Sequence, residues 1–328
     1  MHIKQFIGAA RLFIRSCREF APGSLYIFLK NHIIRRTKNI LRIKEETQPD
    51  ILGIEITTYC PWRCKDCYVP VELRKDRTVI EEDLLSLTLT QTRKYGIRLY
   101  GYMGGEPMRE DTIPLILKVA SQNRDLTFII CTNGYDIARH GASQFINAPN
   151  VGVLLSFDGF EETNDGIRGR GSYKNVMQAA SQLNQLKRIF GASITVRREN
   201  IDEVLSTDFI SHLSNQGFKY VALVKYCATD EAHKDCEVTD NEIISRLAQL
   251  RMKTMTWPIF LQTNLVGDFF SFNRRSAHHT IYLGIRGDIY VKRENMLLPI
   301  GNVWSQTFEG IMTENTVVYG EKYYPINL

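Results

Sequence analysis

Between residues 50 and 225 the chain alternates short β-branched segments with longer segments of helical periodicity. This alternation is typical of β/α units, in which helices cover a parallel sheet. Six such units predict a partial, TIM-like (β/α)6 barrel, and the 328 residues leave room for extensions at both ends. In a parallel barrel the chemistry gathers at the carboxyl ends of the strands. The expected strands are 51–57, 97–102, 126–131, 151–157, 192–197 and 219–224, and the expected helices are roughly 80–94, 112–122, 136–147, 173–189, 202–215 and 239–254.

Three of the seven cysteines lie within eight residues, directly after the first expected strand. Cys60, Cys64 and Cys67 have the spacing C-x3-C-x2-C. Three thiolates can bind three irons of a [4Fe–4S] cluster and leave the fourth iron open to another ligand. A zinc site is one alternative, but zinc needs a fourth ligand, and no matching C-x2-C or H-x3-H pair lies nearby. Unligated structural cysteines are the other alternative.

The cysteine spacing and four further motifs, in the same order, resemble the radical SAM superfamily over roughly residues 50–225. The resemblance implies that Cys60, Cys64 and Cys67 hold one [4Fe–4S] cluster and that S-adenosylmethionine (SAM) binds its open iron. It also places Tyr68, which follows the third cysteine, among the cofactor-binding residues.

A second motif, Gly104-Gly105-Glu106-Pro107, follows the second expected strand and is similar to the family's GGEP motif. The resemblance implies that the glycines let the backbone approach the methionine moiety of SAM. It further implies that Glu106 and the polar groups of the loop hold the ammonium group of that moiety. A plain tight turn is the alternative.

Three shorter motifs complete the expected cofactor site. Thr132-Asn133-Gly134 is similar to a TNG segment whose loop lines the site in many members, with a plain turn as the alternative. Ser156-Phe157-Asp158-Gly159, followed by Asp165-Gly166-Ile167-Arg168-Gly169, resembles a pattern of the subgroup that includes sulfatase maturases and peptide-modifying enzymes. By this resemblance Ser156 binds the ribose, Arg168 meets the cofactor carboxylate and Asp158 belongs to the same binding loop, whereas a solvated surface loop is the alternative. Val196 is expected against adenine, with core packing as the alternative.

Near the C-terminus, residues 283–291 and 301–303 resemble the SPASM or twitch extension, which binds auxiliary iron–sulfur clusters in other members. The bracketing cysteines are missing: Lys292 stands where one is expected, and no cysteine follows Cys236. We therefore expect a degenerate extension that caps the barrel without holding a cluster. Adjacent His278 and His279 are an alternative metal site, although neighbouring histidines are seldom ligands together. The expected domains are 1–48, 49–236 and 237–328.

Residues 1–44 carry ten Lys or Arg and one acid, whereas the whole chain has a net charge of only +5. Apolar residues between Ile3 and Cys17 recur at helical spacing, which predicts a basic amphipathic helix. We expect residues 3–43 to contact a membrane surface peripherally, with packing against the barrel exterior as the alternative. No apolar run is long enough to span a bilayer. The scattered remaining cysteines and the lack of a cleavable signal peptide predict a cytoplasmic protein.

These features predict a radical SAM enzyme that cleaves SAM reductively with electrons from a flavodoxin- or ferredoxin-type donor. The membrane expectation makes a lipid or lipid-linked glycan the first substrate candidate, and a ribosomal peptide or a small metabolite such as a sugar is the alternative. Cys227 follows the sixth expected strand and is a candidate hydrogen-atom donor, although buried thiols are commonly inert. A nucleic-acid substrate is disfavoured, because no aromatic-studded binding module accompanies the basic residues. A non-catalytic iron–sulfur or zinc protein is the alternative from another class.

Overall fold

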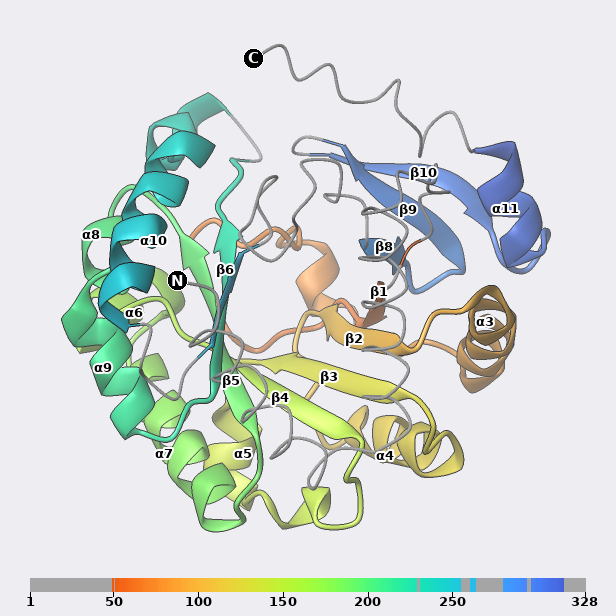
Figure 1. Ribbon diagram of the computed structural model, residues 1–328. Helices are drawn as coiled ribbons and strands as arrows, with labels where there is room; N and C mark the ends of the chain where they lie inside the picture. The colour runs from red at the N-terminus through yellow and green to blue at the C-terminus, as the bar shows by residue number, and fades with distance from the viewer. Residues whose placement is uncertain are drawn as a thin grey trace, which may run out of the picture.

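The computed structural model describes residues 49, 51–228, 231–254, 260–263, 280–293 and 296–315. Within these residues the chain forms one curved sheet of ten strands, and most helices cover its convex side (Figure 1). The strands are ordered β10-β9-β8-β1-β2-β3-β4-β5-β6-β7, and the sheet does not close on itself. From β8 to β7 all neighbouring strands are parallel, whereas β9 and β10 are antiparallel to their neighbours. The strands are β1 (Ile51–Thr57), β2 (Leu99–Gly104), β3 (Thr127–Thr132), β4 (Val151–Ser156), β5 (Phe190–Val196), β6 (Tyr220–Lys225), β7 (Phe260–Thr263), β8 (Thr280–Leu283), β9 (Asp288–Arg293) and β10 (Met296–Asn302).

The predicted partial barrel is therefore confirmed, and each of the six expected strands overlaps one of β1 to β6. Two further parallel strands, β7 and β8, flank them and were not among the expected strands. Each has only four residues, which is too short for an alternation of apolar and polar positions to stand out.

The helices follow the predicted β/α order with two differences. The expected helix 136–147 ends at His140, because Gly141 with a φ of +92° takes a conformation that stops it. The expected loop after β4 contains an additional helix, Glu161–Arg168. The helices are α3 (Glu82–Tyr95), α4 (Ile113–Gln122), α5 (Tyr135–His140), α6 (Glu161–Arg168), α7 (Ser172–Gln185), α8 (Ile201–Val204), α9 (Thr207–Asn215), α10 (Asp240–Thr254) and α11 (Phe308–Glu314), with short 3-10 turns at Leu73–Lys75, Ser143–Phe145 and Glu231–Cys236.

The two faces of the sheet differ in character because side chains alternate along each strand. On β1, Leu52, Ile54 and Ile56 are fully buried in the hydrophobic core under the helices. The intervening Gly53 and Glu55 therefore face the concave side, which we call the inner face. The helices thus pack on the outer face of the strands, and the inner face is the one on which we look for a binding site.

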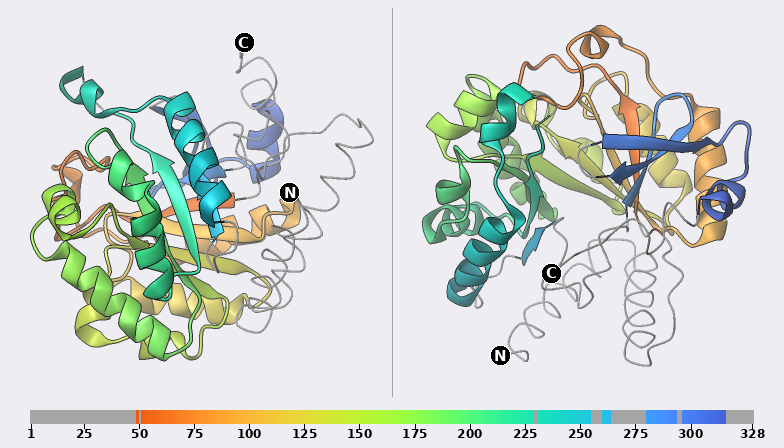
Figure 2. Two further views of the ribbon diagram at one scale, coloured as in Figure 1. Left: turned by 60° about the vertical axis from the view of Figure 1, so that its left-hand side comes forward. Right: turned by 90° about the horizontal axis from the view of Figure 1, so that it is seen from above.

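The described part of the C-terminal extension continues the sheet instead of forming a separate cap over the barrel. Strand β8 pairs with β1 in parallel register, with Gly53 opposite Tyr282, and β9 and β10 follow as antiparallel strands (Figure 2). Helix α11 then packs on α3, where the rings of Phe308 and Tyr95 meet edge to face at 5.1 Å. Strands β8 and β9 of this extension form a hairpin at the β1 edge, whereas the expectation was a cap over the barrel.

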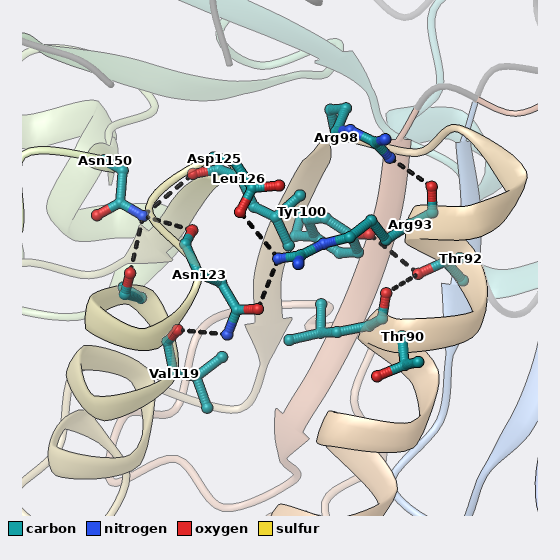
Figure 3. Close-up of polar contacts among 12 residues, drawn as sticks. Thr90, Thr92, Arg93, Arg98, Tyr100, Val119, Asn123, Asp125, Leu126 and Asn150 are labelled. Carbon is teal, nitrogen blue, oxygen red and sulfur yellow. Dashed lines mark hydrogen bonds and ion pairs between the residues drawn. The ribbon is translucent and has the colours of Figure 1, made fainter. Parts of the chain in front are cut away.

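A buried polar network lies at the amino ends of β2 and β3, opposite the end where the motifs gather (Figure 3). The Nδ2 group of Asn150 donates to the carbonyl oxygens of Ala120, Asn123 and Leu126 at 3.0 to 3.1 Å. The Nη2 group of Arg93 donates to Asn123 Oδ1 at 2.7 Å. These bonds hold the turn before β3 against the ends of α3 and α4.

We expect Asn150→Ala to lower the free energy of unfolding by about 2 to 3 kcal/mol, because three carbonyl oxygens each lose the hydrogen bond that the buried Asn150 amide donates. Urea denaturation measures the change. Asn147→Ala is the matched control, since Asn147 is exposed in the same loop. Equal unfolding energies for the two variants would contradict the assignment.

Three predictions lie outside the described residues: the amphipathic helix with its membrane contact at residues 3–43, the His278-His279 pair and the N-terminal boundary at residue 48. Among the helices that are described, none is long and apolar enough to cross a bilayer.

Candidate cluster and cofactor site

The loop that carries the three cysteines begins where β1 ends and is fastened at its base. The N–H of Ile80 donates to Ile56 O at 2.9 Å, and Thr57 Oγ1 donates to Thr78 O at 2.8 Å. Between these bonds Cys60 is buried, and Cys64 and Cys67 are half-buried, all with free thiols. The loop thus presents three thiols at the carboxyl end of the strands, which we call the mouth.

Helix α6 binds the cysteine loop from the side. The N–H of Lys65 donates to Ile167 O at 2.8 Å, and the thiol of Cys64 lies 3.7 Å from Arg168 O. Two motifs that are about a hundred residues apart in the sequence are therefore in contact.

The chemistry of the three thiols fits a cluster. Burial raises the pKa of Cys60 to about 12 and also raises the pKa of Cys64. In the metal-free chain the thiols of Cys60 and Cys64 therefore favour the neutral form, and a bound metal would have to displace their protons. Among the described residues no three His, Cys, Asp or Glu side chains converge as ligands of one metal ion. Three thiols on one loop provide the three protein ligands of a [4Fe–4S] cluster whose fourth iron is open.

The GGEP loop lies directly on the backbone that leads into the cysteine loop. The N–H of Gly105 donates to Thr57 O at 2.7 Å, and that of Glu106 donates to Tyr59 O at 2.9 Å. A Cβ atom on Gly104 would lie 2.2 Å from Thr57 O, and one on Gly105 would lie 2.0 Å from Tyr59 O. In the structure the glycines therefore permit close contact with the cysteine loop, whereas the expected approach to methionine stays a prediction.

The carboxylate of Glu106 joins the GGEP loop to the TNG turn. It is 2% exposed and accepts hydrogen bonds from Met108 N at 2.8 Å, Thr132 Oγ1 at 2.6 Å and Asn133 N at 2.8 Å. These three donors occupy most of its acceptor positions, so Glu106 first of all positions the two loops. Its expected contact with the ammonium of SAM stays a prediction.

One donor of the TNG turn is left for a ligand. Asn133 Nδ2 is buried without a described hydrogen-bond partner, although Asn133 Oδ1 accepts from Tyr135 N at 2.9 Å. A buried orphan donor is costly unless a ligand supplies an acceptor. Its place beside Glu106 fits the predicted binding of SAM.

Burial raises the pKa of Glu106 to about 7, although its three donors oppose the shift. Between about pH 4.5 and pH 7 the folded chain then keeps a proton that the unfolded chain has released. Stability should fall as the pH rises through this window, by about 3 kcal/mol in total. Urea denaturation of the metal-free chain at several pH values measures this as the difference between wild type and Glu106→Gln. A difference that does not change with pH would contradict the prediction.

Asp158 holds Arg168 in place. Asp158 is 1% exposed, its Oδ1 accepts from Thr195 N at 2.7 Å, and its Oδ2 lies 2.7 Å from Arg168 Nε. Asp158 thus has no free carboxylate oxygen for a cofactor and acts through Arg168. The expected contact of the Arg168 guanidinium with the cofactor carboxylate stays a prediction. Ser156 ends β4 on the inner face, opposite Ser193.

The other predicted residues take different places. Val196 is a correction, because its side chain is fully buried in the core under the helices and cannot contact adenine from the inner face. Pro107 is buried where the loop turns into α4, and its carbonyl oxygen accepts from Thr112 Oγ1 at 2.7 Å. Tyr68 joins the site through its hydroxyl, which donates to Gly104 O at 2.9 Å. Cys227 lies beyond β6, with its thiol 3.8 Å from Lys225 O.

Sequence reasoning missed an ion-pair network at the rim of the mouth. Arg197 is 2% exposed, pairs with Asp66 of the cysteine loop and has its Nε 3.1 Å from Glu199 Oε1. His233 Nε2 lies 3.1 Å from the other oxygen of Asp66, and the guanidinium of Arg197 stacks on Tyr226 at 4.3 Å. The sequence signal that could have predicted this network is the acid Asp66 within the cysteine loop and the base Arg197 directly after β5. The network ties the cysteine loop to β5 and to the turn at residues 231–236.

Comparison with known proteins agrees with this geometry. Residues 54–209 match the model of the radical SAM superfamily. This segment is a radical SAM domain. The match spans β1 to β5 and all the predicted cysteine, GGEP, TNG and Asp158–Arg168 motifs. One [4Fe–4S] cluster and SAM are the cofactors that the family implies.

The curated relatives include peptide-modifying enzymes. The chain is 26% identical over 153 residues to the PqqA peptide cyclase of Bradyrhizobium diazoefficiens, which covers 46% of this chain and 40% of the relative. It is 23% identical over 214 residues to the sporulation killing factor maturation protein SkfB of Bacillus subtilis, covering 62% of this chain and 49% of the relative. The matched segments thus span less than half the length of these relatives.

Among solved structures, the fold is similar to SuiB of Streptococcus suis. The SAM-bound form superposes with a TM-score of 0.65 at 16% identity and covers 85% of this chain and 67% of SuiB. The form bound to the precursor peptide SuiA gives a TM-score of 0.61 at 14% identity, with coverage of 92% and 70%. At this identity the likeness concerns the fold.

Proposed function

We propose that this chain is a radical SAM enzyme that modifies a peptide. The observation that carries the proposal is that the fold brings the three thiols, the orphan donor of Asn133 and the Asp158-held Arg168 to one mouth. The names of the similar proteins, a peptide cyclase and a peptide maturation protein, support a peptide as the substrate. These relatives favour the peptide alternative over the lipid or lipid-linked glycan that the basic N-terminus suggested.

The residues of the mouth divide the work of cofactor binding. The three thiolates hold the cluster, and Asn133 and Arg168 offer a neutral and a charged donor to the amino-acid part of SAM. Glu106 keeps the GGEP and TNG loops together, and Asp158 fixes the direction of Arg168. Bound together, the cluster and SAM supply a 5′-deoxyadenosyl radical that takes a hydrogen atom from the substrate.

The open sheet gives a peptide access to the inner face. Strands β7 and β10 are its two ends, and no pairing joins them among the described residues. We further propose that electrons come from a flavodoxin- or ferredoxin-type protein and that the enzyme works in the cytoplasm. Peripheral membrane contact through residues 3–43 remains part of this proposal.

The test uses the full chain, reconstituted anaerobically with iron and sulfide and supplied with SAM and dithionite. We expect the peptide fraction of the producing cells to raise 5′-deoxyadenosine formation above the substrate-free rate and to yield a peptide of altered mass. Proteolysis of that fraction beforehand should remove the stimulation. Stimulation by a lipid extract of the same cells, and none by the peptide fraction, would contradict the peptide proposal.

A further inference from the structure

Glu55 is a carboxylate on the inner face for which none of the predicted motifs accounts. On β1 it alternates with the buried core residues Ile54 and Ile56, so its side chain points to the concave side. It pairs in register with Met103, one step deeper than Gly104, where the GGEP loop begins. Its Cγ lies 3.1 Å from the position that a Cβ atom on Gly104 would occupy. Glu55 therefore lies on the inner face, just below the GGEP loop.

The strands that flank Glu55 directly carry no other charged side chain on the inner face. In-register neighbours on parallel strands share a face, and the positions Gly53, Gly101, Ile129 and Gly152 form one such row across β1 to β4. On the inner face of the described strands β1 to β6 and β8, Glu55 is the only Asp, Glu, Lys, Arg or His. On β9, Asp288 shares the side of Tyr290 and is a second acid on this face.

Tyrosine rings border Glu55 on the side of the C-terminal hairpin. Tyr282 of β8 lies in register with Gly53, and its ring fills the space that a side chain at position 53 would take. Tyr290 of β9 is paired with Tyr282 and therefore faces the same side. Burial raises the pKa of Tyr290, and the charges of Asp288 and then Glu55 raise it further.

Glu55 lacks a cationic partner among the described residues. Burial raises the pKa of Glu55, and the one influence that lowers it is a hydrogen bond with the backbone of Ile285. No described Lys, Arg or His forms an ion pair with it. A half-buried carboxylate without a counter-charge is unfavourable, and an incoming cation removes this penalty. Nearby tyrosine rings also favour a cation.

We propose that Glu55 binds a positively charged group of the substrate, a protonated amine or a guanidinium, and so selects peptides that present such a group at the inner face. The proposal rests on the proposed peptide-modifying function for its substrate class. The apolar row beside Glu55 suits the aliphatic stem of a basic side chain, and the acid meets its charged end.

The test measures binding of n-butylammonium chloride to the full reconstituted chain by isothermal titration calorimetry, with n-pentanol as the uncharged probe of similar size. Glu55→Gln keeps the shape of the side chain and an acceptor for the Ile285 backbone but removes the charge. Glu309→Gln is the matched control, because Glu309 is exposed on α11, far along the chain from the inner face, and loses the same charge.

We expect Glu55→Gln to weaken butylammonium binding at least about tenfold, as the loss of a charge-assisted hydrogen bond implies. Pentanol binding, and both probes with Glu309→Gln, should stay unchanged. Glu55→Asp keeps the charge but shortens the side chain by one methylene, so its affinity for butylammonium should lie between those of wild type and Glu55→Gln. It replaces Glu55→Gln as the test variant if the Gln variant does not fold.

Unchanged butylammonium binding in Glu55→Gln would overturn the proposal. So would a loss of SAM affinity in Glu55→Gln without any effect on butylammonium, because Glu55 would then belong to the cofactor site. Neither result depends on a peptide being modified, so the proposed function and this inference fail separately.

Discussion

Cys64→Ala should abolish SAM cleavage by this chain. With two thiolates left, two irons of a [4Fe–4S] cluster would lack protein ligands, and the cluster should not assemble stably. We expect the reconstituted variant to lose most of its iron and sulfide and to form 5′-deoxyadenosine only at the background rate. Chemical iron and sulfide analysis together with chromatographic detection of 5′-deoxyadenosine measures both effects.

Cys236→Ala is the control for this result. Cys236 is also a free, half-buried thiol, but it lies in the turn at residues 231–236 outside the cysteine loop. It should keep wild-type iron content and activity. Equal losses in the two variants would show that the effect comes from thiol removal in general and would contradict the assignment of the cluster to the cysteine loop.

Gly105→Ala should strongly destabilise the fold. The added Cβ would lie 2.0 Å from Tyr59 O and 2.5 Å from Thr58 O, and both are backbone atoms that cannot rotate away. The GGEP loop must then separate from the cysteine loop and lose the bonds Gly105 N to Thr57 O and Glu106 N to Tyr59 O. We expect a loss of about 3 kcal/mol or more in unfolding free energy, together with poor cluster assembly.

Gly166→Ala is the matched control for this substitution. Gly166 lies within α6, and a Cβ at that position meets no atom within 4 Å. Replacing a helical glycine by alanine there should stabilise the chain by about 1 kcal/mol. Urea denaturation of both variants gives the comparison, and a Gly105→Ala chain as stable as Gly166→Ala would refute the close contact between the two loops.

The motifs that sequence reasoning found at the site share one property: each lies at the carboxyl end of a strand or in the segment that leads from that strand to the next element. Parallel strands bring such positions to one edge whatever their separation in the chain, which is why Cys64 and Arg168 are neighbours in the structure. The same rule could not say what each side chain touches. The carboxylate of Asp158 contacts Arg168 and accepts a hydrogen bond from Thr195. The carboxylate of Glu106 accepts hydrogen bonds from the TNG turn. Buried carboxylates are bonded to the donors that lie nearest to them in the fold.

The predictions that were wrong or missing also have local causes. Val196 and Thr195 differ by one position on β5, and the alternation of faces puts Val196 in the core. Helix α6 was not predicted, because Gly166 within a short segment conceals its helical pattern. Glu55 belongs to no motif, so the sequence alone does not predict a role for it. Its role is inferred from its position on the inner face, beside the hairpin that pairs with β1.

The most direct test of the central claim is electron paramagnetic resonance of the reconstituted, dithionite-reduced chain before and after SAM is added, with iron counted on the same sample. We predict about four irons per chain and a signal that changes when SAM binds the open iron. Bound zinc in place of iron, or a full cluster whose signal does not respond to SAM, would contradict the account and favour a non-catalytic metal protein.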